Sequence, residues 1–223
     1  MALILSIDTS SKNCSVSLAK NGKLIKTMEK ISDSFTHAEK LHLFCKDLMK
    51  KSRHSFSEID AYAFSEGPGS YTGLRIGAAA VKGFGFAFEK PIILVSTLKA
   101  MAFYNKVEKY ISCPLIDSRI GEVYLALYDS KMNCLIKPRS HILTEENILK
   151  DLIKKHKIYF FGTGTEKVKQ AINHKNAYFL NDVFPSSKYL IEIAEKKYNK
   201  KKFADISNFE PLYLKDFIPT IQK

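Results

Sequence analysis

The fold of this chain is decided by Leu5-Ser6-Ile7-Asp8-Thr9-Ser10, an apolar strand that ends in an aspartate and a polar turn. A similar stretch, Pro114-Leu115-Ile116-Asp117-Ser118-Arg119, follows 109 residues later, about half of the 223-residue chain. Each copy precedes a segment of alternating polar and apolar residues, which is the period of a half-buried strand. The repeat predicts two related α/β lobes, each with the element order βββαβα.

The segments around the first copy set the expected domain boundaries. Asn21-Gly22 is a hairpin dipeptide, and Thr36-His37-Ala38-Glu39 has the capping pattern that begins a helix. We expect an N-terminal lobe at residues 1–100 and a C-terminal lobe at residues 101–204. The C-terminal segment, about residues 205–223, can pack back on the N-terminal lobe.

The composition restricts the class of protein. The chain is 45% hydrophobic and 26% charged, which is typical of folded proteins. No run approaches the roughly 20 apolar residues that a membrane span needs. The four cysteines show no CxxC spacing and the chain starts with a strand pattern, so we expect reduced thiols and a cytoplasmic location.

The net charge of +12 is unevenly distributed. Residues 150–202 contain 13 lysines and 5 acidic residues, which gives this quarter a net charge of +8. The chain has 31 lysines but only 4 arginines, whereas specific nucleic-acid readout favours arginine. Solvated helix faces are therefore the first interpretation, and weak RNA contact is the alternative. A basic helix expected at residues 187–202 carries the candidates for that contact: Lys196, Lys197, Lys200, Lys201 and Lys202.

The strand-end aspartates suggest a nucleotide cleft between the lobes. Its candidate residues are Asp8, Thr9, Asp117, Gly162 and Gly164. Nucleotide loops usually contain glycine so that the backbone can approach phosphate, and the turn after Asp8 contains none. A turn-capping aspartate is at least as good an interpretation. We expect neither a cofactor nor a metal site.

The helix expected over residues 72–88 is apolar almost all round, so it must be covered on several sides. Gly73, Gly77 and Ala80 begin a stripe of small residues that lets another helix approach closely. The helix is either central to its own lobe or completed by a partner. In the second case Gly77→Leu should block pairing and leave a folded monomer. The expected partner-binding residues are Leu41, Leu48, Tyr71, Gly73, Leu74, Arg75, Gly77, Ala80 and Val81.

Five segments resemble the TsaB (YeaZ) family, in order and over nearly the whole chain. They are residues 5–10, the turn-and-helix start Gly67-Pro68-Gly69-Ser70-Tyr71-Thr72-Gly73-Leu74-Arg75-Ile76-Gly77, residues 95–98, Ile116-Asp117-Ser118-Arg119-Ile120-Gly121-Glu122-Val123-Tyr124, and residues 211–214. The resemblance implies the two-lobed actin-like, sugar-kinase-like (ASKHA) fold. It also implies a non-catalytic subunit in the synthesis of N6-threonylcarbamoyladenosine at position 37 of tRNA.

The same resemblance implies the partners. The transferase chemistry would belong to the paralogous subunit TsaD, and an ATPase subunit, TsaE, would join the pair. Members of the family also form homodimers through first-lobe helices, here at about residues 37–52 and 72–88. We therefore assign no catalytic residue to this chain.

Two alternatives remain open. An independent small-molecule kinase of the same fold would bind ATP between the lobes through Asp8, Asp117, Gly162 and Gly164. An RNA-binding module would use residues 196–202 and would bind tRNA in a salt-sensitive way.

Overall fold

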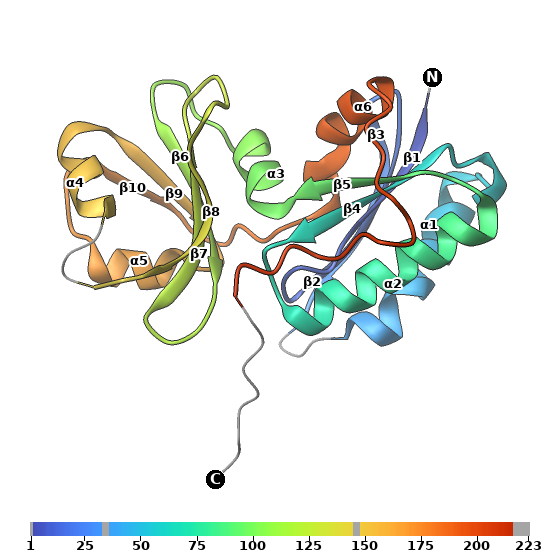
Figure 1. Ribbon diagram of the computed structural model, residues 1–223, viewed down its shortest axis with the longest axis horizontal. Helices are drawn as coiled ribbons and strands as arrows, with labels where there is room; N and C mark the ends of the chain where they lie inside the picture. The colour runs from blue at the N-terminus through green and yellow to red at the C-terminus, as the bar shows by residue number, and fades with distance from the viewer. Residues whose placement is uncertain (1, 33–35, 145–147, 216–223) are drawn as a thin grey trace, which may run out of the picture.

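The computed structural model describes residues 2–32, 36–144 and 148–215 and contains two five-stranded mixed sheets (Figure 1). The first sheet has the strand order β3-β2-β1-β4-β5. Strand β1 pairs antiparallel with β2 and parallel with β4, so it lies at the centre of the sheet. The strands of this sheet are β1 (Leu3–Asp8), β2 (Asn13–Lys20), β3 (Lys23–Ile31), β4 (Ala61–Gly67) and β5 (Ile92–Ser96).

The second sheet repeats this topology. Its order, β10-β9-β6-β7-β8, matches that of the first sheet when it is read from the other edge. Its strands are β6 (Ile111–Asp117), β7 (Glu122–Tyr128), β8 (Cys134–Ile142), β9 (Ile158–Gly162) and β10 (Ala177–Leu180). The predicted duplication of an α/β lobe is confirmed.

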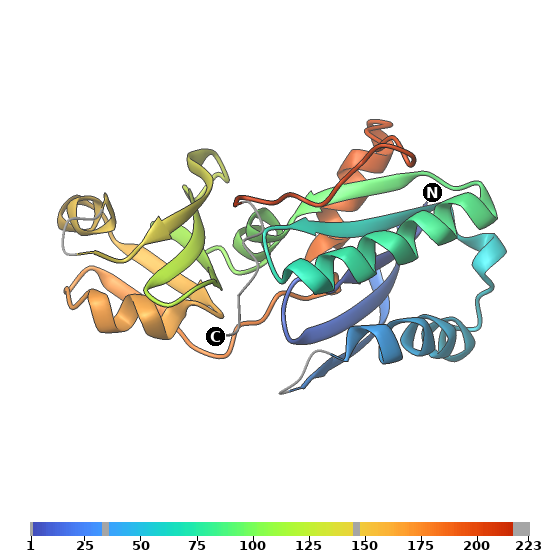
Figure 2. The ribbon, with the colours of Figure 1, turned by 60° about the horizontal axis from the view of Figure 1, so that its bottom comes forward.

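Helices cover both faces of the first sheet (Figure 2). Because successive strand residues point to opposite faces, Leu5 and Phe64 pack toward α1 and α2, whereas Ile4 and Ala63 pack toward α6. The α-helices are α1 (His37–Ser52), α2 (Tyr71–Phe88), α3 (Thr97–Tyr104), α4 (Ile148–Lys155), α5 (Thr165–Ala171) and α6 (Ile191–Asn199), with 3-10 turns η1 (Phe56–Glu58) and η2 (Ser187–Leu190). No helix of the described residues is long and apolar enough to cross a membrane.

Local chemistry explains where the first-lobe elements begin and end. Asn21 and Gly22 both have positive φ angles, of 54° and 72°, as a two-residue hairpin turn requires. The Ser70 side chain caps α2 by accepting a hydrogen bond of 3.2 Å from the Gly73 amide. Helix α2 ends at Glu89 in the left-handed region, with φ of 52°.

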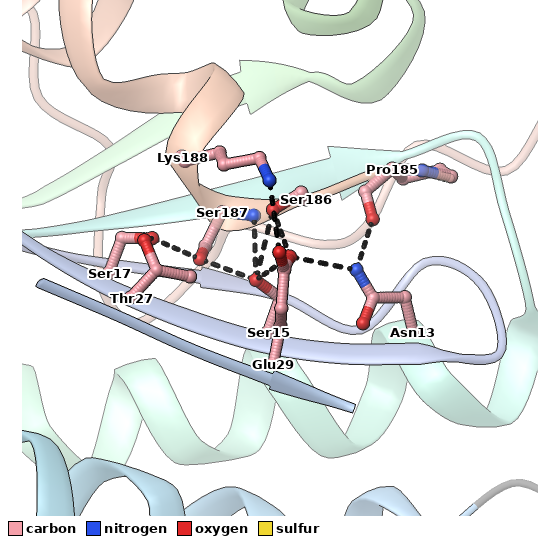
Figure 3. A network of polar contacts seen from close by, with 9 residues as sticks. All are labelled: Asn13, Ser15, Ser17, Thr27, Glu29, Pro185, Ser186, Ser187 and Lys188. Atoms are coloured by element: carbon pink, nitrogen blue, oxygen red, sulfur yellow. Dashed lines mark hydrogen bonds and ion pairs between the residues drawn. The ribbon is translucent and has the colours of Figure 1, made fainter. Parts of the chain in front are cut away.

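The chain returns to the first lobe after β10. Residues 185–188 are held against β2 and β3 by a serine network of nine residues (Figure 3). In it, Ser186 Oγ donates to Glu29 Oε2 over 2.6 Å, and the Ser187 amide donates to Ser15 Oγ over 3.1 Å. The nine residues are Asn13, Ser15, Ser17, Thr27, Glu29, Pro185, Ser186, Ser187 and Lys188.

The expected second-lobe boundary at residue 204 is therefore corrected. Leu190 and Ala194 are buried in the first lobe's core, and the Ala204 amide donates to Ile92 O over 2.8 Å. The long basic helix expected over residues 187–202 is instead η2 followed by α6. Both lie on the first lobe, because their apolar side chains complete the second face of its sheet.

The last described residues cross from the first lobe to the second. Phe209 packs near Phe64 in the first core, and the Leu212 amide donates to Glu66 O over 2.7 Å. Lys215 then forms an ion pair with Glu122 of β7. Residues 205–215 thus form a strap between the lobes, and residues 216–223 of the expected C-terminal segment lie outside the described residues.

Candidate functional site

A cavity of about 630 Å³ lies between the two lobes. Its walls come from residues 10–12 and 68–71 of the first lobe, residues 116–119 of the second, and residues 212–215 of the strap. Of the five residues predicted for a nucleotide cleft, Asp117 lines this cavity and the other four do not.

Asp8 and Thr9 are used inside the first lobe. Asp8 is 1% exposed, and its Oδ1 accepts hydrogen bonds from the Ser10 amide at 2.9 Å and from Ser10 Oγ at 2.7 Å. Burial raises the pKa of Asp8, although the bonds from Ser10 oppose that rise. Thr9 Oγ1 donates to Gly73 O over 2.7 Å. The structure therefore favours the turn-capping interpretation of Asp8.

Asp117 is half exposed, but its carboxylate forms an ion pair with Lys167 Nζ. The same ammonium donates to Arg119 O over 2.8 Å and, at 3.4 Å, to Ser118 O and Glu122 O. A lysine of α5 thus places its ammonium group within the β6–β7 turn. Among the described residues no group of three or more His, Cys, Asp or Glu side chains comes together as a metal site would require.

Gly162 and Gly164 serve the packing of the second lobe. A Cβ on Gly162, whose φ is +119°, would collide with Leu115 O, and one on Gly164 would lie 2.9 Å from Val123 Cγ1. The prediction that these glycines let a backbone approach a nucleotide is corrected, because the space beside each is filled by β6 or β7.

Gly73 and Gly77 face the chain's own first sheet. A Cβ on Gly73 would meet Thr9 O, and one on Gly77 would meet Thr9 Oγ1 and the Phe64 ring. These glycines bring α2 close to β1 and β4 rather than to a second protein. Because of these collisions, we expect Gly77→Leu to disrupt the first lobe rather than to leave a folded monomer.

The larger apolar residues predicted for the interface are also internal. Leu41, Leu48, Leu74 and Val81 are each 0% exposed in the first core. They can position the two helices but cannot offer contact area to a partner, which corrects their expected role.

Tyr71 lines the interlobe cavity, and Arg75 packs against the Tyr71 ring. The Arg75 guanidinium carbon is 4.2 Å from the Tyr71 ring centroid, and the Tyr71 and Tyr213 ring centroids are 5.0 Å apart. This stack joins the start of α2 to the strap. It stabilises the cavity wall beside the first lobe.

A second concave surface, the α1–α2 groove, opens between those two helices with a volume of about 600 Å³. Ala80 is the one predicted partner-binding residue that lines it. No described atom lies within 4 Å of a Cβ built on Gly83, so the groove is open at that point. The groove is lined by Ala38 and His42 of α1 and by Ile76, Ala79, Ala80, Gly83, Phe84, Ala87 and Phe88 of α2.

The floor of the α1–α2 groove is aromatic. The Phe84 ring stacks on Tyr62 and on Phe56, with centroids 5.4 Å apart in each case, and meets His42 edge to face at 5.7 Å. Sequence reasoning missed Ile76 and Phe84 as groove residues. Each lies four residues from Ala80, and Phe84 lies three residues from Ala87, which was the available signal.

The five candidate lysines do not form one free cluster. Lys197 is half-buried, and its Nζ donates to Leu94 O over 2.6 Å. Burial lowers the pKa of Lys197. Lys196 lies 4.6 Å from the Phe103 ring centroid, whereas Lys200, Lys201 and Lys202 are exposed beyond the end of α6. Lys197 is therefore part of the fold, whereas RNA contact through the other four lysines stays a prediction.

The chain matches a known family and known proteins over nearly its whole length. The family model described as TsaD, tRNA N6-adenosine threonylcarbamoyltransferase, matches residues 32–222. The tRNA threonylcarbamoyladenosine biosynthesis protein TsaB of Haemophilus influenzae is 28% identical, over 96% of this chain and 93% of the relative. The protein of the same name from Escherichia coli is 29% identical, over 96% of this chain and 94% of the relative.

One solved structure shows the same fold. It is described as an uncharacterized protein with similarity to peptidase YEAZ from Pseudomonas aeruginosa. It superimposes with a TM-score of 0.83 at 25% identity and covers 96% of this chain and 100% of its own.

Proposed function

The chain belongs to the TsaB (YeaZ) family, and it also matches the family model of TsaD. We propose that it is a non-catalytic subunit in the synthesis of N6-threonylcarbamoyladenosine in tRNA. The names of its relatives, which are tRNA threonylcarbamoyladenosine biosynthesis proteins, support this role. The contacts of Asp8 and Asp117 agree with a non-catalytic role. Asp8 caps its own turn, and Asp117 forms an ion pair with Lys167. These contacts, together with the relatives, disfavour the independent kinase.

The observation that carries the proposal is the α1–α2 groove. It is apolar, lies on the surface and is backed by a fully buried core. Water therefore contacts its alanine and phenylalanine side chains and the backbone at Gly83. Covering such a surface with a second apolar surface is favourable, at about 25 cal/mol per Å² of apolar area removed from water. The groove therefore fits a protein partner better than a small polar substrate.

The partner we propose is TsaD, in a contact that packs two helices from each protein. The match of this chain to the TsaD family model covers residues 32–222, which include both helices, and supports a corresponding pair of helices in TsaD. Two similar helix pairs can pack around an approximate twofold axis, as in isologous dimers. A second copy of this chain would fill the groove in isolation, and TsaE would join the TsaD complex.

The direct test is reconstitution. Purified TsaD and TsaE are assayed for tRNA modification with this protein, without it, and with its Gly83→Glu variant. Glutamate is a better helix former than glycine, and the space at Gly83 is open, so the variant should fold. A charged side chain in the groove should remove both the heterodimer, measured by light scattering, and the modification that depends on it.

The matched control is Asn173→Glu, which adds the same charge at an exposed position in the second lobe. It should pair and function like the unmodified protein. A Gly83→Glu heterodimer of normal affinity, or tRNA modification that is equally fast without this protein, would contradict the proposal.

A further inference from the structure

A second surface with a different chemistry lies on the other face of the first sheet. It combines the end of α3, η2 and α6 around a hollow of about 400 Å³ beside the Gly22 turn. Figure 2 shows α6 and α1 on opposite sides of that sheet. We call this second surface the aromatic–lysine surface. It consists of Phe103, Tyr104, Lys106, Lys188, Tyr189 and Lys196.

The aromatic rings of this surface lie against one another and against ammonium groups. The Tyr104 and Tyr189 ring centroids are 4.3 Å apart, and Tyr104 remains 57% exposed. The Phe103 ring has Lys106 Nζ at 5.0 Å and Lys196 Nζ at 4.6 Å from its centroid. The exposed Tyr104 ring therefore neighbours Phe103, whose ring is flanked by two ammonium groups.

The charge of the surface favours an anionic ligand. Lys188 is paired with Glu29 at 2.9 Å, and Lys196 lies 3.9 Å from Glu192. Lys106 forms no ion pair with any described residue and is exposed. The cations therefore outnumber the acids that face them, and one lysine is available for a phosphate.

We propose that the aromatic–lysine surface binds an unpaired stretch of RNA, with a base stacked on Tyr104 and phosphates near Lys106 and Lys196. Stacking on an aromatic ring combined with a positively charged track is the usual mode of single-strand binding. Lysine ammonium groups suit contacts with the backbone, which position the RNA without reading its sequence. The choice of RNA over other polyanions rests on the proposed function.

This location is compatible with pairing through the α1–α2 groove. The two surfaces lie on opposite faces of one sheet, because Ile4 and Ala63 pack under α6 while Leu5 and Phe64 pack under α1 and α2. RNA and a protein partner can therefore be bound at the same time.

The test measures binding of the full-length protein to a fluorescently labelled, unmodified tRNA transcript. Affinity should fall steeply between about 50 and 200 mM salt. Tyr104→Ala should weaken binding about fivefold or more, and Tyr104→Phe, which keeps the ring, should retain it. Lys106→Glu should weaken binding and lower the salt slope by about 1. The matched control Lys175→Glu makes the same charge change on an exposed residue of the second lobe.

Three results would overturn the inference. The first is the absence of tRNA binding at low salt, and the second is an equal loss from Lys175→Glu and Lys106→Glu. The third is loss of TsaD or TsaE binding by Tyr104→Ala with tRNA binding unchanged, which would assign the surface to a protein. Light scattering of Tyr104→Ala with TsaD tests the proposed function separately, and a heterodimer is expected there.

Discussion

Gly77 of α2 lies directly against Phe64 of β4, so that a Cβ on Gly77 would be 2.6 Å from the edge of the ring. That contact sets the distance between the helix and the sheet. The same helix carries Gly83 on its other side, where a Cβ would meet no described atom within 4 Å. Two glycines of the same helix therefore have opposite roles.

Substitution of these two glycines should change the free energy of unfolding in opposite directions. Gly77→Ala should lower the free energy of unfolding by about 1–3 kcal/mol, because the added methyl overpacks the helix–sheet contact. Gly83→Ala should raise it by about 0.5–1 kcal/mol through better helix propensity. Denaturant unfolding monitored by circular dichroism measures both. Equal stability of the two variants would show that α2 does not pack as described.

The comparison of these glycines also shows what the sequence could predict. The hairpin at Asn21 and Gly22 follows from the turn preference of this dipeptide. The two α/β lobes follow from the repeated strand pattern and the alternation of polar and apolar residues. The buried side of α2 does not, because Gly73 and Gly77 on one side and Gly83 on the other look alike in sequence. Only the position of the sheet distinguishes them.

The return of the chain to the first lobe could not be predicted from the sequence for a different reason. It depends on contacts such as that between Ser15 and Ser187, which are 172 residues apart. Neither serine is unusual in its own neighbourhood, so local patterns placed residues 185–204 with the strands that precede them. The position of the α6 lysines was misjudged with them.

The serine network should make the fold sensitive to acid. Burial alone would raise the pKa of Glu29, but hydrogen bonds from Ser186, Lys188 and Asn13 outweigh it and hold the pKa below its ordinary value. A carboxyl with a lowered folded-state pKa stabilises the fold above its ordinary pKa. That contribution is lost as the pH falls through the lowered value.

Glu29→Gln should therefore lose less stability than the unmodified protein between about pH 5 and pH 3, the range around an ordinary glutamate pKa. Urea midpoints measured across this range provide the check. Glu108→Gln, which removes an exposed carboxylate outside the network, is the control. Identical pH profiles for Glu29→Gln and the unmodified protein would show that the network does not hold this charge.

The strap between the lobes should depend on its last described residue. Lys215 pairs with Glu122, whose side chain is 5% exposed, and Leu212 is bonded to the first lobe through Glu66 O. Lys215→Ala should release the end of the strap from the second lobe. The Leu212 amide should then exchange with deuterium faster, while the Tyr62 amide in the central sheet should be unaffected. Unchanged exchange at Leu212 would mean that the ion pair does not hold the strap.

The interlobe cavity should not bind ATP·Mg²⁺ in the isolated protein. Lys167 neutralises Asp117, the one predicted cleft residue that lines the cavity, and the spaces beside Gly162 and Gly164 are filled by β6 and β7. Calorimetric titration should give no binding heat. A saturable isotherm would restore the kinase alternative.

Removal of the Lys167 ammonium tests the cause of that result. Lys167→Ala leaves the carbonyl groups of Ser118, Arg119 and Glu122 without their shared donor, so stability should fall by about 1–3 kcal/mol. Lys169→Ala, at an exposed position of the same helix, should change stability much less. Because the glycine positions stay filled, Lys167→Ala should still show no ATP·Mg²⁺ binding. Nucleotide binding gained by this variant alone would identify the lysine as the single block to an otherwise intact cleft.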